Sequence, residues 1–96
     1  MNIRFYTDPE TGLPHIYNHD VNEDEVTDIL SNAIEDRSGV DGSRVAIGKT
    51  GGGRFLRVIY VPDPRPDSLF VVTAYELRGK ALQALRRRNK KKHGRS

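Results

Sequence analysis

The chain has no cysteine among its 96 residues, and it has no long apolar run. The missing thiols exclude a disulfide, a cysteine nucleophile and a cysteine-based zinc site. No segment approaches the roughly 20 apolar residues that a membrane-spanning helix needs. The N-terminal residues continue into a polar stretch, which is not typical of a secretory signal. We therefore expect a cytoplasmic protein that makes no membrane contact.

Signatures of several enzyme classes are also missing. No nucleophilic serine motif is present, and the glycines at 51–53 are not followed by the Lys-Ser/Thr pair of a phosphate-binding loop. These glycines separate two strand-like segments and predict a flexible hairpin turn instead. His15 and His19 stand four residues apart, but no third firm ligand accompanies them. We therefore expect no metal and no other cofactor.

The acidic and basic residues are divided unevenly along the chain. Residues 1–77 contain 7 basic and 13 acidic residues, whereas residues 78–96 contain 9 basic residues and no acidic one, for a net charge of +3. So dense a basic segment is typical of contact with an anionic partner, usually nucleic acid. A solvated tail that aids solubility is the alternative, and no large apolar residue follows Leu85 to anchor a membrane. The nucleic-acid interpretation assigns contacts to Arg86, Arg87, Arg88, Lys90, Lys91 and Lys92.

The length of the chain suits one domain with one modest core. In its first half, alternating apolar residues indicate a strand over residues 2–6, and the sequence Asp-Pro-Glu-Thr-Gly at 8–12 indicates a turn. Asn22 and Glu25 have the spacing of a capping box. A helix is predicted over residues 22–33, with an apolar stripe of Val26, Ile29, Leu30 and Ala33. Residues 13–20 have no clear period.

The second half of the chain is richer in strand signals. Residues 35–43 are polar and contain two glycines, which predicts a loop. Strands are expected at 44–50, 54–61 and 69–76, joined by short connections that favour antiparallel pairing. A helix over residues 78–88 follows. We expect an α+β domain over residues 1–88 with a small antiparallel sheet of about four strands, both helices or one of them on a single face, and a basic, disordered tail over residues 89–96.

Three short motifs have a familiar form. Residues 19–26 read His-Asp-Val-Asn-Glu-Asp-Glu-Val, residues 48–61 follow the pattern G-x-T…G-R-x-L-x-V-x-Y, and residues 71–75 read Val-Val-Thr-Ala-Tyr. They resemble the helix start, the hairpin and the third strand of BrnT-type toxins in the RelE-like superfamily. They are also similar to a related family of uncharacterised small domains. Asp20 and Tyr75 differ from that pattern, which has glycine and arginine at these two places.

The resemblance implies a RelE-like fold and the activity of a metal-independent ribonuclease. It also implies two partners, an RNA substrate and a cognate antitoxin protein that neutralises the toxin. Such cleavage needs a base for the 2′-hydroxyl proton, an acid for the leaving oxygen and cations for the charge on the phosphorane. His19 is the best candidate for proton transfer, since imidazole exchanges protons near neutral pH. Arg57 and Tyr75 complete the predicted catalytic set.

Strand alternation limits which basic residues can join this set. Arg54 and Arg57 have odd spacing, so on a strand they project from opposite faces of the sheet. We favour Arg57, because a charge among apolar strand residues needs a reason. Tyr75 and Lys49 would share its face if the strand registers permit. The residues expected to bind nucleic acid near this site are Lys49, Arg54, Arg78 and Lys80.

Two other functions stay open at this point. One is a non-catalytic nucleic-acid-binding module that keeps the fold and the basic end. The other is a protein-interaction or regulatory domain whose basic end docks on an acidic partner. In either case, His19 would only bond the backbone at the helix start, and Arg57 would be an ordinary outer-face arginine.

Overall fold

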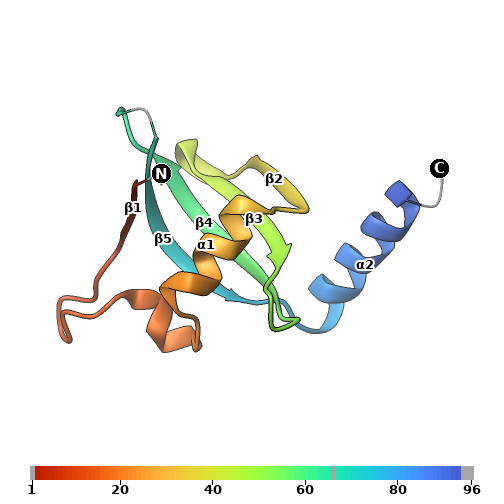
Figure 1. Ribbon diagram of the computed structural model, residues 1–96, viewed down its shortest axis with the longest axis horizontal. Helices are drawn as coiled ribbons and strands as arrows, with labels where there is room; N and C mark the ends of the chain where they lie inside the picture. Colours follow the sequence, from red (N-terminus) through yellow and green to blue (C-terminus); the bar gives the residue numbers. More distant parts are fainter. Residues whose placement is uncertain (1, 66, 94–96) are drawn as a thin grey trace.

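The computed structural model describes residues 2–65 and 67–93 as an α+β domain built on a five-stranded sheet (Figure 1). The strand order is β1-β5-β4-β3-β2, with β1 parallel to β5 and every other pair antiparallel. The strands are β1 (Asn2–Phe5), β2 (Glu35–Ser38), β3 (Arg44–Lys49), β4 (Phe55–Pro62) and β5 (Ser68–Glu76). The predicted fold class is confirmed, with five strands instead of about four.

The additional strand, β2, lies where the sequence predicts a loop. Three of its four residues are charged, so it has no apolar alternation to reveal it. Its order comes from pairing with β3 and from bonds made by Asp36. The Tyr60 hydroxyl donates to Asp36 Oδ2 at 2.6 Å, and Arg44 Nε donates to Asp36 Oδ1 at 2.9 Å. These partners are distant in sequence, so local patterns cannot predict the strand.

The first helix, α1 (Glu23–Ser31), begins at the predicted capping box. The Asn22 side chain accepts a hydrogen bond from Glu25 N at 2.9 Å, and the Glu25 carboxylate accepts one from Asn22 N at 3.1 Å. Val26 and Ile29 are fully buried against β3 and β4. A Cβ on Gly48 of β3 would lie 3.3 Å from Ile29 Cδ1, so this glycine lets the helix approach the sheet closely.

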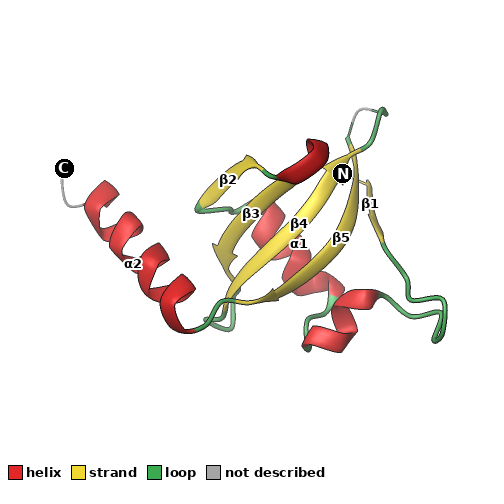
Figure 2. Ribbon diagram, turned by 180° about the vertical axis from the view of Figure 1, so that it is seen from behind, coloured by secondary structure: helices red, strands yellow, loops and turns green. Residues whose placement is uncertain are grey.

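One face of the sheet holds the main core. The side chains of Ala46, Val58 and Ala74 point from this face toward α1 and toward a short 3-10 helix, η1 (His15–His19). We call the opposite side the outer face, and Figure 2 shows it with α1 behind the strands. By strand alternation and register, the outer face carries Lys49, Phe55, Arg57, Ile59, Thr73 and Tyr75.

The second helix, α2 (Gly79–His93), packs beside the outer face and not on the side of α1. Its Leu85 is only 1% exposed and forms a second apolar cluster with Ile47 and Leu77. Of the two expected arrangements, the structure therefore has the one with a single helix, α1, on the core face. The helix also runs five residues beyond Arg88, so residues 89–93, which the sequence assigns to the tail, belong to α2. Residues 94–96 of the expected tail lie outside the described residues.

Neither α1 nor α2 is long and apolar enough to cross a membrane, as judged over the described residues.

Candidate functional site

The strand registers place three predicted site residues on the outer face. Arg57 lies opposite Tyr75 in the β4–β5 pair and opposite Ile47 in the β3–β4 pair. Lys49 follows Ile47 by two residues on β3, so it projects from the same side. The strand registers therefore permit Arg57, Tyr75 and Lys49 to share one face, as the sequence analysis required.

Arg57 and Tyr75 contact each other directly. Arg57 Nη1 donates to the Tyr75 hydroxyl oxygen at 3.2 Å, and its Cζ lies 5.8 Å from the centre of the tyrosine ring. Arg57 Nε and the neighbouring Thr73 Oγ1 are buried without a hydrogen-bond partner among the described residues. A buried polar group left in this way costs about 1–3 kcal/mol. Arg57 also forms no ion pair with any described carboxylate, so its charge is uncompensated.

His19 reaches this site around the edge of the sheet. β1 ends at Phe5, opposite Val71, and η1 lies beside the part of β5 beyond that point. Ile16, which is 1% exposed, fixes η1 in the core. The His19 ring then lies edge-on to the Tyr75 ring, with 6.0 Å between their centres.

His19 and Tyr75 line an open depression of about 350 Å³. Its wall is made by residues of η1 and the turn after it, by the end of β5 and by the start of the segment that leads to α2. These residues are Asn18, His19, Asp20, Tyr75, Glu76 and Arg78. Three residues predicted separately, His19, Tyr75 and Arg78, therefore lie around one depression.

The pair of His15 and Asp8 lies beside His19 and supports its ring. His15 Nδ1 lies 2.9 Å from Asp8 Oδ1, and the Asn18 amide donates to Asp8 Oδ2 at 2.6 Å. The His15 ring lies edge-on to His19, with 5.2 Å between ring centres. Contacts thus run without interruption from Asp8 through both histidines and Tyr75 to Arg57. Sequence reasoning weighed His15 only as a metal ligand and did not single out Asp8, because nothing local signals a pairing formed across a turn.

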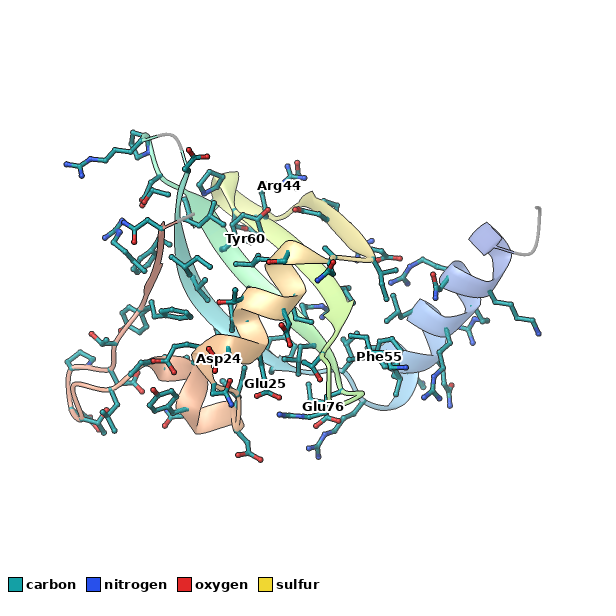
Figure 3. The ribbon with its side chains drawn as sticks, in the orientation of Figure 1. Asp24, Glu25, Arg44, Phe55, Tyr60 and Glu76 are labelled. Atoms are coloured by element: carbon teal, nitrogen blue, oxygen red, sulfur yellow. The ribbon has the colours of Figure 1, made fainter. Side chains whose placement is uncertain are left out.

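Arg54 serves the fold of the site. Its Nη1 donates to the backbone oxygen of Asp20 at 3.0 Å and to Glu25 Oε2 at 2.8 Å, and its Nε lies 3.4 Å from Glu76 Oε1. Figure 3 shows Glu25 and Glu76 at the same end of the molecule. Arg54 and Arg57 project from opposite faces, as their spacing predicts. Two carboxylates balance the charge of Arg54. It therefore links Asp20 and Glu76, which line the depression, and it offers little charge to a ligand.

The other predicted nucleic-acid contacts divide into two groups. Arg78 Nη2 lies 3.3 Å from Glu76 Oε1 but is 82% exposed, and Lys80 is exposed as well. Arg88 donates twice to Glu35, at 2.7 and 3.0 Å. Lys49, Arg86, Arg87 and Lys90 are exposed and form no ion pair with a described residue, whereas the side chains of Lys91 and Lys92 lie outside the described residues.

The resolved pKa shifts of acids and phenols near the sheet have structural causes. Hydrogen bonds from Arg4 and from Ser68 hold the pKa of Asp63 below its usual range. Burial raises the pKa of Tyr60, and its hydrogen bond to Asp36 adds to the effect. These groups fasten β1 and β2 to the rest of the sheet. Within the described ranges, no three His, Asp or Glu side chains are grouped as metal ligands would be.

Comparison with known proteins adds no relative to this description. The chain matches no protein-family model, and no curated protein or solved structure matches it significantly. The resemblance to BrnT-type toxins therefore stays a prediction from short motifs, and the function has to be argued from the geometry of the site.

Proposed function

We propose that the protein binds RNA and cleaves it without a metal ion, as the toxin of a toxin–antitoxin pair. The observation that carries the proposal is that His19 of η1 and Tyr75 of β5 line one open depression, while Arg57 of β4 donates to the Tyr75 hydroxyl. These are the kinds of group that metal-free RNA cleavage requires: two that can exchange protons and one fixed cation.

The proposed reaction uses the 2′-oxygen of the RNA as the nucleophile. His19 accepts the 2′-hydroxyl proton as the 2′-oxygen attacks the adjacent phosphorus. The bond from phosphorus to the 5′-oxygen then breaks, which leaves a 2′,3′-cyclic phosphate and a free 5′-hydroxyl. Because Arg57 donates to the Tyr75 oxygen, the hydroxyl proton of Tyr75 is free to pass to the leaving 5′-oxygen. The guanidinium of Arg57 stabilises the negative charge that develops on the phosphorane.

The surroundings of the depression suit a backbone phosphate. The space is shallow and open, as needed for a chain that enters and leaves at two sides. Arg78 stands at its rim and is exposed enough to meet an incoming anion. The chemistry requires a 2′-hydroxyl, so the proposal predicts that DNA is bound but not cut.

The test is cleavage of a labelled single-stranded RNA in excess EDTA, beside an all-deoxy strand of the same sequence. We expect the wild type to cut only the RNA, and His19→Ala and Arg57→Ala to lose about 100-fold or more of kcat. Arg65→Ala is the matched control, since it removes an exposed arginine from the β4–β5 connection. Induced expression should also arrest growth, and both site variants should relieve the arrest. A wild type that leaves RNA intact would exclude the ribonuclease function.

The basic surface of α2 favours a second candidate, a module that binds nucleic acid without cutting it. Like the ribonuclease, such a module would lose affinity for nucleic acid steeply as the salt concentration rises. It differs in two results, because the wild type would then leave the labelled RNA intact, and His19→Ala would bind RNA as the wild type does.

A further inference from the structure

We propose that Lys49 and Arg86, both placed against the ring of Phe55, form a second phosphate site for the RNA nucleotide next to the one held by Arg57 and Tyr75. This inference rests on the proposed function. It makes the substrate a single strand whose backbone runs along β4 toward α2.

The two cations converge on one aromatic ring. Lys49 Nζ lies 5.7 Å from the centre of the Phe55 ring, and Arg86 Cζ lies 6.0 Å from it. Neither cation forms an ion pair with a described residue, so no carboxylate balances this pair of charges. Like charges held near one ring repel each other, and an anion between them removes that repulsion. The arrangement therefore favours a phosphate.

Packing fixes the Phe55 ring and the backbone that carries each cation before a ligand arrives. Phe55 is half-buried against the apolar cluster of Ile47, Leu77 and Leu85. Lys49 is the direct partner of Phe55 in the β3–β4 register. Arg86 follows the buried Leu85 on α2, which fixes the rotation of the helix. Figure 3 shows Phe55 between the sheet and the first turns of α2. Because the ring and the backbone are already ordered, only the two exposed cationic side chains lose entropy on binding.

The spacing of the two sites fits one RNA strand. Phe55 and Arg57 are two residues apart on β4 and project from the same face, so they lie about 6.7 Å apart. This is the order of the distance between successive phosphates in an extended strand, which a basic groove can follow. In-line attack by the 2′-hydroxyl also requires an unpaired backbone, because the A-form duplex does not align the attacking and leaving oxygens.

The same helical turn supplies a matched control. Arg87 is exposed and forms no ion pair with a described residue, whereas Arg86 lies over Phe55. Arg87→Ala removes the same charge from α2 without touching the proposed site. Phe55→Leu keeps an apolar side chain in the cluster but removes the ring that positions both cations.

The experiment measures binding of a short single-stranded RNA whose cleavage-site 2′-hydroxyl is replaced by hydrogen, by fluorescence anisotropy over a range of salt. We expect Arg86→Ala and Lys49→Ala each to weaken binding several-fold. Their double variant should reduce the salt slope by about 0.7, the value for one phosphate contact on a single strand. Arg87→Ala should weaken binding by less than half as much as Arg86→Ala does. The effect of Phe55→Leu should lie between the effects of these two variants.

A second ligand separates this site from a general effect of charge. A dinucleotide with one bridging phosphate fills only the Arg57 site, so the double variant should bind it as the wild type does. The proposal is overturned if Arg87→Ala weakens RNA binding as much as Arg86→Ala, or if the double variant loses affinity for the dinucleotide. Failure of the wild type to bind RNA would instead refute the proposed function. Circular dichroism verifies the fold of each variant. If Phe55→Leu unfolds, the comparison of Arg86→Ala with Arg87→Ala decides the result, because both residues are exposed.

Discussion

Replacing Leu85 with alanine should release α2 from the sheet while the rest of the domain stays folded. Leu85 is 1% exposed and is the one described residue of α2 that is fully buried in the second cluster. Beyond it, α2 is held by the partly buried Ala81 and Leu82 and by the ion pair of Arg88 with Glu35. The helix is therefore fastened mainly at one point.

The structure sets the size of this effect. Truncation of a buried leucine to alanine costs about 2–5 kcal/mol, and the lower half of that range applies where the surroundings can close over the gap. The exposed ion pair adds at most about 1 kcal/mol and cannot replace the lost contact. A loss of about 2–3 kcal/mol raises the detached population of α2 roughly 30- to 150-fold.

Amide hydrogen exchange measures this directly. Protection should fall for the backbone amides of residues 82–90 and stay near wild type for the central strand β4. Ile29→Ala is the contrasting variant, because Ile29 lies in the main core and its loss should lower the protection of every strand. If Leu85→Ala lowers protection in β4 as much as in α2, the helix is part of the cooperative core and the reasoning is refuted. RNA affinity should fall with α2 protection, since Arg86 then leaves Phe55.

Two further predictions concern stability. Arg4 lowers the folded pKa of Asp63, so the stability that this ion pair contributes is present above the unfolded pKa and is lost as the pH falls through the folded pKa. Urea unfolding at pH values from 5 down to 2 should therefore show a larger loss of unfolding free energy for the wild type than for Asp63→Asn. Equal losses would contradict the assignment. Gly48→Ala should lower the melting temperature by several degrees, because its Cβ would crowd Ile29, whereas Gly52→Ala, with no atom closer than 3.8 Å, should change it little. A calorimetric scan of both glycine variants decides the second point.

The sequence predicts those parts of the fold whose signals are local. The capping box of Asn22 and Glu25 locates α1, and the glycines at 51–53 locate the β3–β4 hairpin, because each feature is complete within a few residues. The strand β2 is not predictable in this way, since pairing with β3 and bonds from Tyr60 stabilise it. The parallel pairing of β1 with β5 depends on contacts more than 60 residues apart in the chain.

The candidate site shows the same division. Residue type selects His19, strand alternation selects Arg57, and the resemblance of the third strand draws attention to Tyr75, so all three are candidates from the sequence. The role of Arg54 is not visible in the sequence, because Glu25 lies 29 residues before it and balances its charge only in the folded chain. Spacing on a strand predicts which face of the sheet a residue occupies, but it does not predict which acidic side chain pairs with it on that face.

The placement of uncompensated charge connects these observations. Arginines that hold the fold together, such as Arg4 and Arg54, are each paired with carboxylates. Lys49, Arg57 and Arg86 have no such partner among the described residues, although the body of the chain has an excess of acidic groups. Lys49 and Arg57 lie on the outer face, and Arg86 reaches it from α2. Arg87 and Lys90 also lack an ion pair with a described residue, but Lys49, Arg57 and Arg86 differ from them because each lies against an aromatic ring of the outer face. Like charges without counter-ions do not stabilise a fold, so this placement supports the proposed anionic ligand.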